Sequence, residues 1–384
     1  MYKRQGRLVP RIVQPREQAR SGRRRLGQLP HPFAPIELFR NPIAFFEKLA
    51  QQQGPRALLQ AGKQRFYLVN DPELIRDFLV NESGHFEKFP KIDKTRGLFG
   101  EGLLTSEDPL HLRQRRLVQP AFQRERMAGY ADEMVASTKR LCASWEDGQR
   151  FDAVQAMNTL ALDIVSRTLF STQTDDRAAR IAHSLDEVLH TLNHLVMPWG
   201  NLMLSLPLPI TRRYHAALDV LDEIVYGFIG ERRASGVDHG DLLSLLLAAR
   251  DAETGEQMSD QQLRDEVMTI FVAGHDTSAN ALAWSLYLLS QNPEPRERME
   301  SDDHLLTYTS AVFHAALRLY PPVWILGRRA LEDYKYQDFH APKGSILLVC
   351  MSVLHRQASL WDDPLVFRPE RWLGEVNQHR YASL

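Results

Sequence analysis

The sequence predicts a mainly α-helical fold with small β-sheets, an α+β protein. Apolar residues recur at helical spacing through most of residues 109–291. Short apolar runs bounded by glycine or proline are typical of strands. Four such runs lie at 57–61, 65–69, 325–331 and 345–350. Because no repeat or low-complexity linker divides the chain, we expect a single mixed domain at residues 29–384.

Composition and charge set limits on function. With 43% hydrophobic residues among 384, the chain can bury a large core. Its 47 basic and 48 acidic residues nearly cancel, so we expect no nucleic-acid partner. No window approaches the roughly 20 apolar residues that a membrane span needs, and we expect no membrane span. The two cysteines, Cys142 and Cys350, are too far apart to form a metal or redox motif, which favours a reducing cytoplasm.

The first 28 residues are strongly basic. Nine arginine and lysine residues stand there against a single acid, Glu17. Charge runs of this kind are usually solvated and disordered, so we predict a disordered arm at residues 1–28. Binding of anionic lipid or nucleic acid by this arm is the alternative.

Local signals predict the elements before residue 110. Residues 42–53 have helical apolar spacing and end at a glycine–proline pair. The strand-like runs at 57–61 and 65–69 flank a glycine-containing turn at 62–64, which predicts a β-hairpin. A further helix is expected at 71–80.

A long helix is predicted at residues 260–291. Ser259 followed by Gln262 forms a capping-box pattern at its start, and Asn292-Pro293 ends the apolar repeat. At 1.5 Å per residue this helix is roughly 50 Å long, enough to cross a whole domain.

The middle of this helix reads Ala273-Gly274-His275-Asp276-Thr277, where a buried helix would carry hydrocarbon. Gly274 costs a helix about 1 kcal/mol relative to alanine. We therefore expect that the function requires a position without a side chain. The missing bulk beside an acid and an alcohol would let a flat or diatomic ligand approach the backbone. The alternative is a kinked core helix in which Thr277 bonds back to the carbonyl of Ala273.

Three further segments carry candidate binding or structural cations. His111 and Arg115 lie four residues apart on one helical face, where two cations can clamp paired carboxylates; an exposed basic turn is the alternative. Arg318 lies near the end of a helix that stops at a double proline. Arg328 falls in the strand that follows, and Arg371 in an aromatic turn.

In this order and at these separations, the segments resemble the cytochrome P450 family, the haem-thiolate monooxygenases, and in particular its soluble bacterial members. The resemblance covers residues 29–384 and implies the triangular, mainly helical fold of that family around the long helix. It implies haem b as cofactor, a hydrophobic small-molecule substrate oxidised with O2, and electrons from a separate ferredoxin- or flavodoxin-type donor. It also implies a monomeric, cytoplasmic enzyme.

The resemblance implies a role for each matched residue of the central helix. Ala273 and Gly274 would lie against the haem. Thr277 would hydrogen-bond the dioxygen, and Asp276 would relay protons to it from solvent. Apolar residues expected to line the substrate pocket, with Ala273, are Leu98, Phe99, Leu103, Phe271, Val323, Trp324 and Ile325.

The matched cations are implied to hold the haem propionates. His111 and Arg115 match the helix that meets one propionate, and Arg328 matches the arginine that meets the other. Arg329 beside Arg328 leaves this register open by one residue.

One departure from the family pattern concerns a structural network. The Glu-x-x-Arg helix of the family has Ala315 here in place of its glutamate. In the family this glutamate pairs with the arginines matched by Arg318 and Arg371. We therefore expect these two guanidiniums to repel each other or to reach water.

A second departure concerns the haem iron. The sequence ends at Leu384, before the family's loop that carries the haem-ligating cysteine, so we expect a chain truncated before that loop and without a metal ligand. Cys350 has no glycine loop around it and is expected to be a core residue with a raised pKa. Haem binding by this chain is therefore in doubt.

Two functions of different class follow. The first is a haem-thiolate monooxygenase for a hydrophobic small molecule. The second is a non-catalytic, haem-free degenerate relative or fragment that acts at most as a binding scaffold. A thiolate-type spectrum under carbon monoxide distinguishes the two.

Overall fold

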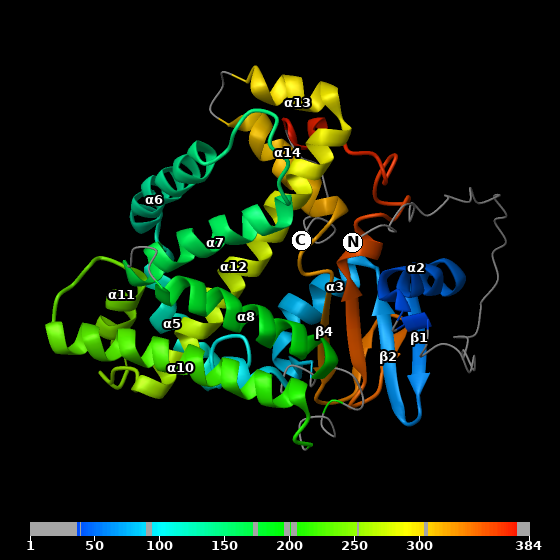
Figure 1. Ribbon diagram of the computed structural model, residues 1–384. Coiled ribbons are helices and arrows are strands. Elements are labelled where there is room, and N and C mark those ends of the chain that lie inside the picture. The colour runs from blue at the N-terminus through cyan, green and yellow to red at the C-terminus, as the bar shows by residue number, and fades with distance from the viewer. Residues whose placement is uncertain are drawn as a thin grey trace.

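The computed structural model describes residues 37–374, except residues 39, 90–93, 172–175, 196–199, 201–205, 252 and 303–305. The predicted basic arm at 1–28 lies outside the described residues. Figure 1 shows a roughly triangular outline, with helices filling the left and upper parts and the main sheet at the lower right. The predicted fold class, mainly helical with small sheets, is confirmed.

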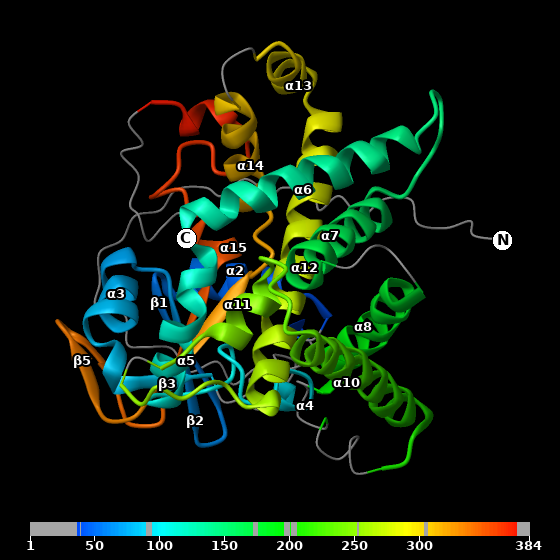
Figure 2. The same cartoon turned by 90° about the vertical axis from the view of Figure 1, so that its left-hand side faces the viewer.

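Helix α12 (Asp260–Gln291) has the predicted bounds at both ends. The Ser259 side chain accepts a hydrogen bond from the backbone N–H of Gln262 at 3.2 Å, which is the expected N-cap. At the other end, the side chain of Asn292 donates to the carbonyl oxygen of Leu288 at 2.7 Å. Both views show α12 running through the middle of the helical part (Figures 1 and 2).

The largest core cluster surrounds the first half of α12. Side chains of Val165, Leu185, Leu221 and Phe271 are all buried in it, and each stabilises the fold by about 1.5–3 kcal/mol. The helical elements of this part are α4 (Arg96–Phe99), α5 (Leu110–Val118), α6 (Arg124–Ala143), α7 (Ala153–Phe170), α8 (Asp176–Leu195), α10 (Pro209–Ser235) and α11 (Leu242–Ala248). Helices α7 and α10 pack directly on α12, so this helix is held on two sides.

The main sheet has five strands in the order β1 (Arg56–Ala61), β2 (Gln64–Val69), β7 (Ile346–Cys350), β4 (Ile325–Ala330) and β3 (Phe86–Lys88). The predicted hairpin is confirmed, and its turn is one residue shorter than expected because Ala61 pairs with Gln64. Strand β2 runs parallel to β7, and β4 runs antiparallel to it. The sequence did not predict β3, or the two-stranded sheet of β5 (Tyr334–Tyr336) and β6 (Phe339–Ala341).

Strand β7 lies at the centre of this sheet with every residue buried. Its alternate side chains enter two different clusters because successive residues point to opposite faces. Leu348 packs in the cluster of Phe46 from α2 (Pro42–Gln53), whose predicted bounds are confirmed. Val349 packs in the cluster of Phe78, which lies in the π-helical turn Asp77–Asn81 after α3 (Pro72–Arg76).

The C-terminal part caps the second half of α12. Helix α14 (Thr307–Leu319) packs on α12 and on a 3-10 turn, Pro369–Trp372, while α13 (Pro293–Glu300) and α15 (Met351–Leu354) flank it. Ala315 is buried on α14 together with Leu288 and Phe367. No helix within the described parts of the chain is long and apolar enough to cross a membrane.

Candidate active site

The middle of α12 is open to solvent although the turns before it are buried. Ala273, Gly274 and Asp276 are exposed and Thr277 is partly exposed, whereas Phe271 is buried. An exposed stretch in a helix that otherwise crosses the core presents backbone and small side chains to a ligand. It is the same stretch that the sequence predicts as a candidate site.

Two hydrogen bonds fix the polar side chains of this stretch. The Thr277 hydroxyl donates to the carbonyl oxygen of Ala273 at 2.7 Å, as the alternative interpretation of the sequence predicted. Because this bond uses the hydroxyl hydrogen, the Thr277 oxygen presents lone pairs to a water or ligand. The Asn280 amide donates to the carboxylate of Asp276 at 3.2 Å, and Asp276 remains exposed to solvent.

Gly274 faces a neighbouring helix. A Cβ atom at this position would lie 3.4 Å from Cγ2 of Val165 on α7. This distance is an ordinary van der Waals contact, so packing against α7 does not by itself require a glycine. The expectation that the glycine makes room for a ligand stays a prediction.

The residues predicted to line the substrate pocket differ in how deeply they are buried. Leu98, Phe99 and Phe271 are buried in the largest core cluster. Val323 is 57% exposed. Leu103, Trp324 and Ile325 are partly buried. The buried residues support the backbone of the site, and only the others can touch a ligand without rearrangement.

A pair of cations lies side by side on the sheet. Lys88 of β3 and Arg328 of β4 are direct partners across the strands. Like charges in this position destabilise a sheet unless an anion lies between them. The Arg328 guanidinium donates to the carbonyl of Gly327 at 3.0 Å, and no described carboxylate forms a hydrogen bond with it.

His111 on α5 belongs to the same charged cluster. Burial lowers its pKa, and the charge of Lys88 lowers that pKa further. Arg115 lies one helical turn later on α5 and is exposed. Three cationic or ionisable groups from three elements, Lys88, His111 and Arg328, therefore converge where a doubly acidic ligand edge could bind.

Arg328 and Arg329, between which the sequence left the register open, have different partners in the structure. Arg329 pairs with Glu87 on β3, so its charge is already balanced. Arg328 forms no hydrogen bond with a described carboxylate; burial lowers its pKa, and the charge of Glu107 offsets only part of that effect. Lys88 was missed by the sequence reasoning because its position opposite Arg328 depends on strand register, which no local pattern of a three-residue strand reveals.

A loop joins this cluster to α12. The carboxylate of Asp265 accepts the backbone N–H of Glu101 at 2.9 Å, and that of Glu266 accepts the N–H of Leu103 at 3.1 Å. Lys88 donates to the carbonyl of Leu103 at 2.9 Å from the other side. The next residue, Leu104, is 42% exposed. Charged side chains of α12 and β3 thus hold the loop that carries this exposed apolar residue.

Glu266 makes the stability of the chain depend on pH. Burial raises the pKa of Glu266 to about 7. Its stabilising contribution is therefore present below the unfolded-state pKa of roughly 4.5 and is lost as pH rises through 7, by about 2–3 kcal/mol. We expect Glu266→Gln to remove that part of the pH dependence in urea melts at pH 5–8. Asp276→Asn, an exposed acid of the same helix, is the control, and an equal effect of both changes would contradict the assignment.

Arg318 on α14 does not reach water. It is only 2% exposed, so that part of our expectation was wrong. Its guanidinium donates instead to the carbonyl oxygens of His355 at 2.7 Å, Pro364 at 2.6 Å and Val366 at 3.1 Å. The expected repulsion is present: burial lowers the pKa of Arg318 to about 10, and the charges of Arg371 and Arg356 contribute.

The two cysteines lie away from the open stretch of α12. Cys142 is exposed on α6. Cys350 ends β7 in the cluster of α2, and burial raises its pKa to about 11, as predicted for a core thiol. A thiol with such a pKa is a poor metal ligand at neutral pH.

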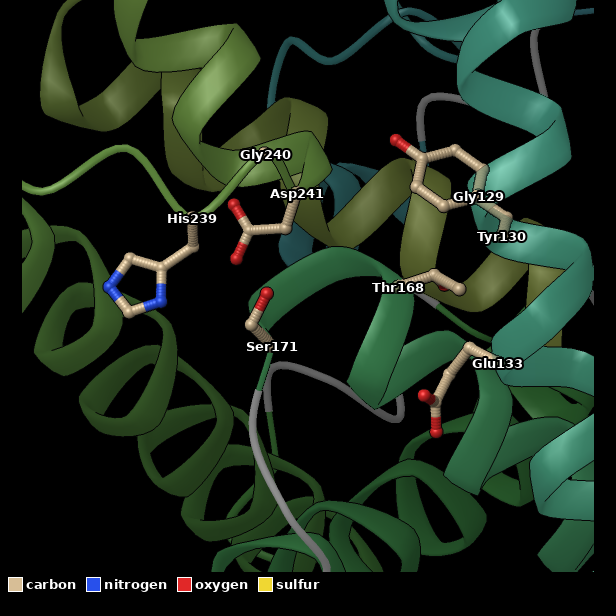
Figure 3. Close-up of a pocket in the computed structure, with 8 residues that line it drawn as sticks. All are labelled: Gly129, Tyr130, Glu133, Thr168, Ser171, His239, Gly240 and Asp241. Atoms are coloured by element: carbon tan, nitrogen blue, oxygen red, sulfur yellow. The ribbon is translucent and has the colours of Figure 1, made fainter.

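A second hollow, of about 280 Å³, lies between α6, the end of α7 and the residues before α11. Figure 3 shows the Ser171 hydroxyl pointing toward the Asp241 carboxylate within it. Asp241 is already paired with Arg232 at 2.6 Å and caps α11 through the N–H of Ser244. Its charge is structural, so this hollow is not the candidate active site.

The chain is similar to known proteins of one family. The family model for cytochrome P450 matches residues 33–384. Cyclooctat-9-en-7-ol 5-monooxygenase of Streptomyces melanosporofaciens is 36% identical over 91% of this chain and 79% of its own length. Pentalenene oxygenase of Streptomyces avermitilis is 33% identical over 88% of this chain and 78% of its own length.

A solved structure agrees with this placement. The crystal structure of the cytochrome P450DA heme domain superposes with a TM-score of 0.81 and 28% sequence identity, over 94% of this chain and 85% of that chain. The predicted resemblance is confirmed by sequence and by fold. The chain belongs to the cytochrome P450 family.

Proposed function

We propose that this cytochrome P450 oxidises an unsaturated, terpene-type hydrocarbon or an alcohol derived from it. Membership of the family makes the chain one of the haem-dependent monooxygenases that act on hydrophobic small molecules. Two relatives are named for pentalenene and for cyclooctat-9-en-7-ol. The observation that carries the proposal is the open stretch of α12, where Ala273 and Gly274 are exposed. Val323, one of the predicted wall residues, is also exposed and could contact an apolar ligand.

A haem fits the residues present on two of its sides. The exposed backbone at Ala273 offers a surface for a flat ring, and Lys88 and Arg328 offer paired charge for its propionates. The two cysteines do not fit the haem iron, since Cys142 is exposed on α6 and burial raises the pKa of Cys350. When bound through a thiolate, haem supplies the activation of dioxygen, which no side chain can perform.

Thr277 and Asp276 are proposed to move protons at this face. The Thr277 oxygen can accept a hydrogen bond from a water while its own hydrogen stays on the carbonyl of Ala273. Asp276 is exposed one residue away and can exchange protons with solvent. A water held by Thr277 would thus receive protons through Asp276.

His111, Arg115 and Arg328 are proposed to bind the propionates, and Lys88 joins them. His111 and Arg115 lie one turn apart on α5, while Lys88 and Arg328 lie opposite each other on the sheet. Charge-assisted hydrogen bonds from such groups would fix the orientation of the ring.

Family membership implies electrons from a separate redox partner, and we propose a donor of ferredoxin or flavodoxin type. We further propose a monomeric, cytoplasmic enzyme. Both described cysteines are free, one of them exposed, which suits a reducing compartment.

A chimera tests the proposed function. Residues 1–374 are joined to the C-terminal segment, with its haem-ligating cysteine, of cyclooctat-9-en-7-ol 5-monooxygenase. We expect a thiolate-type spectrum under carbon monoxide, a substrate-induced spectral shift with pentalenene or cyclooctat-9-en-7-ol, and a hydroxylated product. The 384-residue chain is the control and should show no thiolate-type spectrum. A chimera that holds haem through the thiolate, yet neither binds nor oxidises these compounds, would refute the substrate class.

A further inference from the structure

The guanidinium of Arg318 is buried with part of its hydrogen-bonding capacity unused. Its terminal nitrogens donate to three backbone carbonyls, while Nε is buried and has no hydrogen-bond partner. The ring of Trp361 covers one face, with its centroid 5.0 Å from the guanidinium carbon. Among the residues that the structure describes, no carboxylate forms a hydrogen bond with Arg318. The buried positive charge therefore has carbonyl dipoles but no described anionic hydrogen-bond partner, and its desolvation costs free energy.

Two more guanidiniums converge on the same place. Arg356 donates to the carbonyl of Leu319, the residue after Arg318, at 2.7 Å. Arg371 donates to the carbonyl of Asp363 at 3.0 Å, next to a carbonyl that Arg318 itself uses. Arg356 has a carboxylate partner, Glu47, at 3.2 Å. Three cations thus share one region. Arg371 also interacts with the charges of Asp362 and Asp363. Arg318 is the buried one of the three, and its Nε has no described hydrogen-bond partner.

Ala315 lies on the same helix as Arg318, three residues earlier, and is buried with 1% exposure. Residues three apart on a helix are neighbours on one face. Ala315 therefore presents only a methyl group on the face of the helix that carries Arg318, and a longer side chain there could extend toward the guanidinium. We propose that a small monovalent anion, no larger than a carboxylate group, binds beside Ala315 and Nε of Arg318, within reach of Arg371.

Anion-dependent stability tests this site in the 384-residue chain. Urea melts are run with sodium gluconate replaced stepwise by sodium formate at constant ionic strength, because gluconate is too large to enter. A site with a Kd of about 10 mM would raise the folding equilibrium constant about twentyfold at 200 mM formate. A parallel series with sodium chloride shows whether a halide fills the site as well as formate does.

Two variants provide matched controls. Ala315→Glu supplies its own carboxylate, and Ala315→Gln fills the space without charge, so neither should respond to formate by more than about twofold. Broadening of the chloride-35 NMR signal by the parent chain, removed by formate, is an independent readout that needs no variant. A parent chain equally stable in formate and gluconate, or an Ala315→Glu variant that responds like the parent, would overturn the proposal.

Discussion

Thr277→Ala in the haem-loaded chimera is expected to lower the yield of product per electron by about 10- to 100-fold, with most reducing equivalents released as peroxide. The reason is local: Thr277 is the hydroxyl of the open stretch of α12, and it is held by its bond to the carbonyl of Ala273. Without that hydroxyl, the water that brings protons is not positioned. Haem content and substrate affinity should stay unchanged.

Thr277→Ser and Thr277→Val are the controls for this prediction. Serine keeps a hydroxyl that can make the same backbone bond, so coupling should largely return. Valine keeps the shape and loses the hydroxyl, so it should behave like alanine. A valine variant that couples electrons to product as well as the parent would show that Thr277 has only a packing role.

Ala315→Glu is expected to stabilise the chain, and Arg371→Ala should then become strongly destabilising. A carboxylate at position 315 would face the buried Arg318 and could pair with Arg371, whose turn packs on the same helix. Breaking a buried ion network costs about 3–5 kcal/mol because a charge is left unpaired. In the parent chain the same Arg371→Ala change removes a repelling charge and should cost little.

Urea melts of the four chains, in gluconate buffer, measure this coupling. We expect an interaction free energy of about 1–3 kcal/mol between positions 315 and 371. Glu370→Gln, a change on the neighbouring acid that pairs with Arg298, is the control and should not couple to position 315. Additive effects of Ala315→Glu and Arg371→Ala would mean that the two sites are not neighbours.

Sequence reasoning placed the central helix correctly because its signals are local. The Ser259 cap and the Asn292-Pro293 stop mark its ends, and the structure begins and ends α12 there. The hairpin and the central strand β7 were also predictable, since apolar runs between glycine turns leave few alternatives.

Other parts of the site depend on contacts between distant segments. The pairing of Lys88 with Arg328 follows from strand register, and β3 is too short to be recognised from its pattern. The side chain that faces Gly274, Val165, lies more than a hundred residues earlier. Arg318 donates to backbone carbonyls instead of to water, because buried donors in a folded chain are paired with nearby acceptors.

The retention of haem by two neighbouring arginine variants tests the proposed binding of the propionates. The claim is that Arg328, with Lys88, holds an acidic edge of the haem, whereas Arg329 is paired with Glu87. The rate of haem transfer from the chimera to apomyoglobin is measured for Arg328→Gln and Arg329→Gln. Haem loss should be at least about tenfold faster in Arg328→Gln, because a charge-assisted bond is lost, and the rate should be unchanged in Arg329→Gln. Equal rates in the two variants, or faster loss in Arg329→Gln, would contradict it.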